Sequence, residues 1–392
     1  MNTERRREQT IGPTHWVELD GVRGLAALLV VYVHLFLRWV PAHPAPVFWL
    51  RTCSGMAWTG VDLFFILSGF LIGGILLRNR EAENYYQVFY LRRAFRILPL
   101  YFVLLVCFFA IRFGLPLGHS ESFAAGGIPF WTYPLLIQNF PMAQTGAWGA
   151  APLSITWSVA LEEQFYIFLP LLIRALSPRA QLPVFTLLAL SGPFFRWIIP
   201  VASPTFLLPG SLEPFFAGVI LAWLYQHRSD LFDAPKWGTV ALAVCATGGL
   251  GMARIAVGWG DFGLFRETVI TVFWGAFLWL VLLFKGTRFT APLRWAPLCW
   301  VGGISYGVYL LHLVFSHVAF LGVLGALPTE SQGLVGFLLT CLALALTLSV
   351  AALSARYFER PLTALGHRQG YRKATPADDI LLSKPPTEQS PL

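Results

Sequence analysis

The apolar stretch Arg23-Gly-Leu-Ala-Ala-Leu-Leu-Val-Val-Tyr-Val-His34 decides the class of fold, because it reads as a hydrophobic helix with an ionisable residue at each end. At about 100° and 1.5 Å per residue, these two residues share one helix face and lie roughly 16 Å apart along the axis. If Arg23 lies at a membrane surface, His34 lies near the mid-plane. We therefore expect a surface cation above a buried base, both facing one cavity. Ionisable groups at such depth indicate a functional site.

The rest of the chain also has the composition of a membrane protein. Hydrophobic residues make up 56% of the 392 residues and charged residues only 12%, whereas soluble domains carry about 25% charged residues. The segment 128–141 is short and interrupted by proline, and we interpret it as re-entrant or interfacial. Windows of about 20 apolar residues predict ten spans, near 22–40, 58–77, 97–114, 155–173, 181–200, 209–226, 237–257, 264–284, 299–320 and 334–355. We predict an all-α membrane protein, a bundle of about ten transmembrane helices.

The positive charges predict the orientation of this bundle. With ten spans and the N-terminus inside, 22 of the 28 Lys and Arg residues fall in the inner segments, which favours both termini in the cytoplasm. The net charge of +8 then reflects topology rather than binding of nucleic acid. We expect a cytoplasmic tail over 1–15, one transmembrane domain over 16–362, and a cytoplasmic tail over 363–392. The polar, proline-containing end of that tail predicts disorder.

A pair of adjacent carboxylates lies inside the predicted span 155–173. Glu162 and Glu163 point about 100° apart, so they need not share a role. Ser158, Glu162 and Tyr166 follow at four-residue spacing and form one stripe along the helix. Either these groups form a buried polar network that holds the bundle together, or one Glu orients a catalytic histidine or contacts the acceptor.

A cluster of arginines precedes the predicted span 97–114. Arg92, Arg93 and Arg96 are spaced three and four residues apart, so at least two guanidinium groups converge on one helix face. Guanidinium groups bind phosphate oxygens in a bidentate manner. The alternative is an ordinary positive anchor on the cytoplasmic side.

The remaining polar residues in the spans have both a structural and a functional interpretation. His34 is either a structural hydrogen-bonding residue or a general base that activates a hydroxyl. His312 lies in mid-span with Tyr309 three residues before it, and structural hydrogen bonding explains them as well as catalysis does. Asp62 lies at the outer start of a span, where we favour helix capping. The five cysteines have no metal-binding spacing, so we expect no metal.

Several stretches, taken in order, resemble the acyltransferase-3 family of integral-membrane acyltransferases. The resemblance covers about residues 15–362. The matching pieces are Leu19-Asp20-Gly21-Val22-Arg23-Gly24 leading to His34, Val61-Asp62-Leu63-Phe64-Phe65 through Ser68-Gly69-Phe70-Leu71-Ile72, Arg92-Arg93 with Arg96 and Pro99, Gln138-Asn139-Phe140, Trp157-Ser158 through Glu162-Glu163-Gln164-Phe165-Tyr166, Ser305-Tyr306 through Tyr309 and His312, and Glu359-Arg360-Pro361.

The resemblance implies about ten membrane helices and transfer of an acyl group, commonly acetyl, from cytoplasmic acyl-CoA to a hydroxyl. The acceptors in this family are sugars of surface polysaccharides, exported oligosaccharides or peptidoglycan, or small natural products. Some relatives carry an esterase-like domain after the bundle, and we expect this chain to group with the single-module members that lack it.

The family's functional positions map onto this chain residue by residue. Arg23 and His34 match its essential pair, Arg93 and Arg96 its two-arginine motif, and Glu162 with Glu163 its acidic site. The implied roles are that the arginines hold the phosphates of coenzyme A and that His34 takes the proton from the acceptor hydroxyl. The acyl group then passes either directly to the acceptor or through an acyl-histidine, and the sequence does not distinguish the two.

We therefore expect an O-acyltransferase that spans the bacterial plasma membrane several times and contacts its lipids. The co-substrate is acyl-CoA and the acceptor a carbohydrate or a lipid-linked carbohydrate, with neither metal nor nucleic acid. A proton-coupled transporter would also carry intramembrane His and Glu, but it favours inverted repeats, which the sequence does not display. A purely structural membrane protein would leave the buried charges unexplained.

Overall fold

The computed structural model describes residues 16–40, 51–115, 121–259, 262–327 and 333–372. All the regular elements in these ranges are helices, which confirms the predicted all-α class. The predicted N-terminal tail over 1–15 and the part of the predicted C-terminal tail from 373 onward lie outside the described residues.

Eight described helical segments are long and apolar enough to cross a membrane. A further helix, α6 (Thr156–Ala175), is 20 residues long and carries Glu162 and Glu163. The eight segments contain α1 (Val17–Val31), α3 (Gly60–Arg78), α4 (Tyr85–Gly114), α9 (Leu212–His227), α10 (Ala234–Ala256), α11 (Arg266–Leu283), α13 (Ser305–Leu324) and α14 (Gly333–Ser354), the last continued by η14 (Ala355–Glu359) and α15 (Arg360–Gly366).

Two predicted spans differ from single straight helices. The predicted span 181–200 is divided into α7 (Pro178–Leu190) and α8 (Gly192–Ile198). Pro193 lies in the first turn of α8, where a helix does not need the amide hydrogen that proline lacks, so a new helix starts there. The predicted span 299–320 is interrupted at Ile304, between α12 (Ala296–Gly303) and α13. The segment 128–141 holds the short η6 (Phe130–Thr132) and the start of α5 (Asn139–Thr145).

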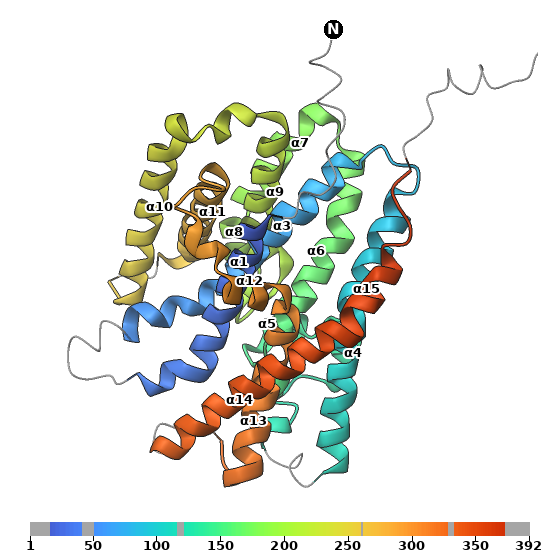
Figure 1. Ribbon diagram of the computed structural model, residues 1–392, viewed down its shortest axis with the longest axis vertical. Helices are drawn as coiled ribbons and strands as arrows, with labels where there is room; N and C mark the ends of the chain where they lie inside the picture. The colour runs from blue at the N-terminus through green and yellow to red at the C-terminus, as the bar shows by residue number, and fades with distance from the viewer. Residues whose placement is uncertain (1–15, 41–50, 116–120, 260–261, 328–332, 373–392) are drawn as a thin grey trace, which may run out of the picture.

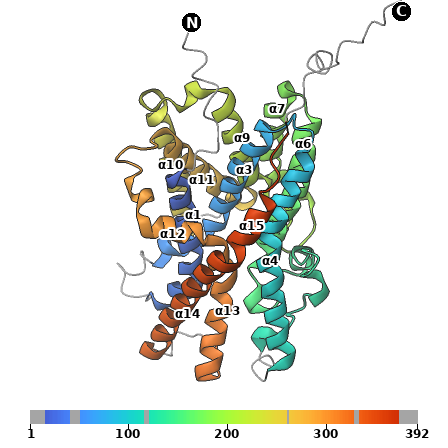
Figure 2. The same cartoon turned by 45° about the vertical axis from the view of Figure 1, so that its right-hand side comes forward.

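The bundle has two sides joined by a central group of helices (Figures 1 and 2). Helices α10 and α11 pack together on one side, and α4 lies on the opposite side near α6. Helices α1, α3 and α9 lie between them, while α13 and α14 pack side by side. The described chain then returns through α15 along α4.

The crossing of α3 and α9 depends on two glycines. A Cβ atom at Gly218 would lie 2.6 Å from the backbone nitrogen of Phe70, and one at Gly69 would lie 3.0 Å from the carbonyl carbon of Phe215. Only a residue without a side chain lets the two backbones approach this closely, as is common between membrane helices. The crossing therefore fixes the height of Ser68, which precedes Gly69.

Stacked aromatic rings attach α6 to the same pair of helices. The ring of Phe215 on α9 lies 4.3 Å from the ring of Phe65 on α3 and 4.3 Å from that of Phe165 on α6. All three side chains are buried. Such contacts add to the stability that the buried area supplies, and they place the carboxylate-bearing helix against α3.

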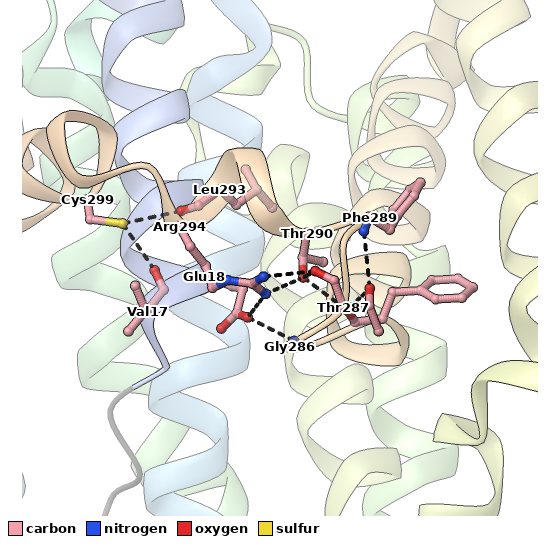
Figure 3. Close-up of polar contacts among 10 residues, drawn as sticks. Val17, Glu18, Gly286, Thr287, Phe289, Thr290, Leu293, Arg294 and Cys299 are labelled. Carbon is pink, nitrogen blue, oxygen red and sulfur yellow. Dashed lines mark hydrogen bonds and ion pairs between the residues drawn. The ribbon is translucent and has the colours of Figure 1, made fainter.

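A group of hydrogen bonds around Glu18 holds the first turn of α1 (Figure 3). Glu18 accepts hydrogen bonds from the backbone amide of Gly286 and from Nη1 of Arg294, each at 2.9 Å. Arg294 also donates to Thr290 Oγ1 at 3.0 Å and to the carbonyl of Thr287 at 2.9 Å. The connection between α11 and α12 therefore fixes the start of the helix that carries Arg23 and His34.

The segment after α15 packs against the start of α4. Asn84 donates to the carbonyl of Gly370 at 2.9 Å and accepts from the amide of Arg372 at 2.9 Å. The predicted disordered tail begins at 363, but α15 extends to Gly366 and residues 367–372 make these contacts. Residues 367–372 show no apolar face in the sequence, because polar and backbone groups hold this segment against α4.

Candidate active site

A pocket opens among α1, α3, α4, α6 and α13. It receives Arg23 from α1, Arg93 and Arg96 from α4, and Glu162 from α6. Three guanidinium groups thus face one carboxylate, and the surplus of positive charge favours an anionic ligand. The other polar residues that line it are Ser68, Ser158, Tyr166, Ser305, Tyr306 and Tyr309.

Glu162 is held by two hydroxyl groups. Ser68 and Tyr166 both donate to its Oε1 atom, and the two hydroxyl oxygens lie 3.1 Å from each other. Tyr166 reaches Glu162 because the two residues are one helical turn apart. Hydrogen bonds to a charged acceptor are stronger than those between neutral groups, so this arrangement fixes the carboxylate in one orientation.

All three residues of the stripe predicted on α6, Ser158, Glu162 and Tyr166, line the pocket. Ser158 and Tyr309 are joined by a hydrogen bond of 2.6 Å between their hydroxyl oxygens, and Tyr309 lies within 3.2 Å of the carbonyl of Ile155. Glu163 is absent from the residues that line the pocket, as the rotation of about 100° between neighbours implies. Its Oε1 atom is buried without a hydrogen-bond partner among the described residues.

The predicted arginine cluster divides into two parts. Arg93 and Arg96 line the pocket, and the guanidinium of Arg93 lies 5.8 Å from the centre of the Tyr166 ring. Arg92 faces the C-terminal segment instead, where it donates to the carbonyl of Gln369 at 2.7 Å and lies 5.2 Å from the centre of the Tyr371 ring. Arg92 is therefore an attachment point for residues 367–372.

The same arginines affect the C-terminal segment electrostatically. Burial, together with the positive charges of Arg92, Arg93 and Arg96, lowers the pKa of His367. A protonated His367 would add a further positive charge beside these arginines, so the folded state favours the neutral ring.

Arg23 and His34 occupy different places, contrary to the prediction that they face one cavity. Arg23 lines the pocket and forms an ion pair of 3.2 Å with Asp20, whereas His34 is absent from the lining residues. Phe64 packs against the apolar side of α1 and lies edge-on to Tyr309, with ring centres 5.9 Å apart. Both rings line the pocket together with Arg23. A common helix face therefore does not place Arg23 and His34 in one cavity.

His34 contacts a second histidine. It lies in η1 (Tyr32–Phe36), a turn of π-helix that continues α1, and such turns occur frequently at functional sites. Its Nδ1 atom lies 3.2 Å from Nε2 of His312, which is fully buried on α13. The rings of His312 and Tyr309 have centres 6.1 Å apart, so Tyr309 connects this pair with the pocket.

Asp62 lies away from the pocket. It is buried in the first turn of α3 and has Glu267, Glu213 and Arg266 as electrostatic neighbours. The N-cap residue of α3 is Thr59, and no side-chain capping hydrogen bond forms there, so helix capping by Asp62 stays a prediction.

Three polar residues of the pocket, Ser68, Ser305 and Tyr306, have no role predicted from the sequence. Ser68 holds Glu162, and Tyr306 donates from its hydroxyl to the carbonyl of Ile97 at 2.8 Å. A signal for Ser68 was present, since it is the one hydroxyl residue in the apolar run from Leu63 to Leu77. Tyr306 could not be singled out, because its partner belongs to a helix more than 200 positions away.

Comparison with known proteins shows which family the chain resembles. A family model described as an acyltransferase domain matches residues 16–356. The chain is 26% identical over 378 residues to the "Putative peptidoglycan O-acetyltransferase YrhL" of Bacillus subtilis, covering 91% of this chain and 56% of that protein. It is 24% identical over 388 residues to the O-acetyltransferase OatA of Staphylococcus aureus, covering 93% of this chain and 60% of that protein.

The chain thus spans little more than half the length of these curated relatives. No solved structure matches it. Because the family model extends over most of the chain and includes α1, α3, α4, α6 and α13, the chain belongs to the acyltransferase-3 family of membrane proteins.

Proposed function

We propose that this protein is a membrane O-acyltransferase that moves an acyl group, in the first instance acetyl, from acyl-CoA to a hydroxyl of a cell-surface carbohydrate in the bacterial plasma membrane. The observation that carries the proposal is the convergence of Arg23, Arg93 and Arg96 on a pocket that also holds Glu162. The names of the relatives support acetyl as the group and a peptidoglycan-type sugar as the acceptor class.

The arginine-lined pocket suits the donor. Coenzyme A carries a diphosphate and a 3′-phosphate, and three guanidinium groups supply forked donors for these anions. Arg96 and Arg93 are fixed by one helix and Arg23 by another, so the pocket is organised before the ligand binds. The same charge would oppose binding of a cationic substrate.

His34 is the base of the proposed reaction. It removes the proton from the acceptor hydroxyl, whose oxygen attacks the thioester carbonyl carbon. The carbon–sulfur bond breaks, and the proton held by His34 passes to the departing sulfur. Tyr309 lines the pocket and its ring centre lies 6.1 Å from that of His312, the neighbour of His34, so the acyl end of the donor would reach His34 past Tyr309.

The test uses the purified chain in detergent with acetyl-CoA and a soluble sugar acceptor. We expect transfer by the wild type, its loss in His34→Ala, and binding of coenzyme A that is retained in His34→Ala but lost when Arg93 and Arg96 are both replaced by alanine. Full transfer by a folded His34→Ala variant would contradict the proposal. Flux of a solute through reconstituted vesicles without any acyl transfer would favour the transporter instead.

A further inference from the structure

The contact between His34 and His312 joins two helices at buried polar atoms. His34 Nδ1 lies 2.9 Å from the backbone carbonyl of Val30 and 3.2 Å from Nε2 of His312. On the other ring, His312 Nδ1 lies 2.7 Å from the carbonyl of Tyr309 and 3.3 Å from that of Val308. Each Nδ1 atom therefore faces an oxygen that can only accept a hydrogen bond.

These partners determine where the ring protons lie. A carbonyl oxygen has no hydrogen to give, so Nδ1 of His312 carries a proton and its Nε2 atom, in the neutral ring, has a free lone pair. The same argument places a proton on Nδ1 of His34, shared between Val30 and His312. The Nε2 atom of His34 is then the unprotonated one.

We infer that His312 is a positioning residue for His34: its Nε2 atom accepts a hydrogen bond from Nδ1 of His34, which leaves Nε2 of His34 free to take the proton of the acceptor hydroxyl. This inference rests on the proposed function, in which His34 is the base. Catalytic bases are commonly oriented by a third group in this way. Here the third group is a neutral imidazole.

The contact also acts after the proton has moved. When Nε2 of His34 takes a proton, the ring becomes an imidazolium, and its Nδ1 hydrogen points at the lone pair of a fully buried neighbour. A hydrogen bond to a charged donor is stronger than one to a neutral donor, and more so away from water.

The charged and titratable neighbours do not replace this acceptor. Arg38 donates to the backbone carbonyl of His34 at 2.5 Å and brings a positive charge beside the ring. His317, further along α13, gives its Nδ1 hydrogen to the carbonyl of Leu313 at 2.7 Å. The hydroxyl of Tyr309 is bonded to Ser158. Among these groups, His312 is the one with a lone pair facing Nδ1 of His34.

The experiment compares His312→Gln with His312→Leu in the purified chain. The glutamine side chain places an amide oxygen near the former Nε2 position, whereas leucine fills the space without an acceptor. We expect kcat for acetyl transfer to fall about 10- to 100-fold in His312→Leu and less than about 10-fold in His312→Gln, with KM for acetyl-CoA unchanged in both. His317→Leu is the matched control and keeps kcat within about twofold, since the hydrogen bond of that ring within the described residues is to Leu313 of its own helix.

A spectroscopic measurement separates positioning from a merely structural role. Nitrogen-15 NMR of histidine-labelled protein reports which ring nitrogen carries the proton. We expect the Nδ1-protonated form for His34 in the wild type, and more of the other form in His312→Leu. The Nε2-protonated form in the wild type would overturn the inference.

The outcomes also separate this inference from the proposed function. Inactive His34→Ala with fully active His312→Leu overturns the positioning role and leaves His34 as the base. Equal loss in His312→Gln and His312→Leu, with melting temperature and coenzyme A binding unchanged, overturns it as well, because His312 would then act through an imidazole of its own. Acetyl transfer by the His34→Ala variant would overturn the proposed function itself.

Discussion

Arg92 and Arg93 are adjacent in the chain but serve different parts of the molecule: Arg93 lines the pocket, and Arg92 lies 5.2 Å from the centre of the Tyr371 ring. Replacing each by alanine should therefore separate two properties. We expect Arg93→Ala to weaken binding of coenzyme A about 10- to 100-fold, the loss of one or two charge-assisted hydrogen bonds. Arg92→Ala should change it less than about threefold. Isothermal titration with coenzyme A makes this measurement.

A second ligand tests which phosphate group of coenzyme A binds to Arg93. Binding of 3′-dephospho-coenzyme A should depend on Arg93 as binding of the parent compound does if the diphosphate lies there, and should be insensitive to it if the 3′-phosphate does. Equal weakening by Arg92→Ala and Arg93→Ala would contradict the division of the cluster.

The attachment of the C-terminal segment gives the second prediction. In Arg92→Ala the stacking on Tyr371 and the hydrogen bond to Gln369 are both lost, so residues 367–372 should exchange their amide hydrogens faster. Hydrogen exchange read by mass spectrometry checks this. Arg228→Ala is the control, because Arg228 lies exposed and pairs with Asp230 elsewhere on the surface.

The third prediction concerns the carboxylate in the pocket. Glu162→Gln removes the charged acceptor of Ser68 and Tyr166, so we expect destabilisation of about 1–2 kcal/mol and acyl transfer reduced about tenfold or more. Binding of coenzyme A should not weaken, because a negative charge has been removed from beside three arginines. Thermal unfolding and titration are the measurements. Glu81→Gln is the control, since the Glu81 side chain is 82% exposed.

The glycine crossing gives the fourth prediction. Gly218→Ala forces a methyl group against the backbone of Phe70 and should destabilise the folded protein by about 1–3 kcal/mol or more. Gly322→Ala is the matched control, because a Cβ atom at Gly322 meets no other atom within 4 Å and alanine is the better helix former. Melting temperature in detergent distinguishes them. An unchanged melting temperature for Gly218→Ala would show that the helices can separate without loss.

The fifth prediction concerns the hydrogen bonds of Glu18 at the start of α1. Glu18→Gln leaves Arg294 with its bonds to Thr287 and Thr290 but without its buried carboxylate. We expect a cost of about 1 kcal/mol, kept small by the partial exposure of Arg294, and faster amide exchange at Gly286. A matching loss in the Arg294→Ala variant, with little further loss in the double variant, would show that the two residues act as a pair.

Helical periodicity predicted the parts of the site that lie on one helix. The stripe of Ser158, Glu162 and Tyr166 depends only on four-residue spacing, and all three residues line the pocket. The same rule predicted that two arginines of the cluster converge, although it could not tell which two.

Contacts between distant segments could not be predicted in this way. The contact of His34 with His312 forms only because α13 packs beside α1, and no pattern within α1 reports it. Arg92 turns away from the pocket because the chain returns along α4 some 280 positions later. Pro193 is visible in the sequence, but the apolar residues on both sides of it predict one continuous span, whereas the structure has two helices there.

The edge-on contact of Phe64 and Tyr309 has an electrical consequence. Any protein with polar groups deep in a bilayer risks a leak of protons or salt, which would discharge the potential across the membrane. An acyl group is neutral and passes an apolar constriction at small cost, whereas a hydrated ion does not. Phe64 and Tyr309 make part of the lining of the arginine-containing pocket apolar, and in the proposed reaction this part would admit the acyl group more readily than a hydrated ion.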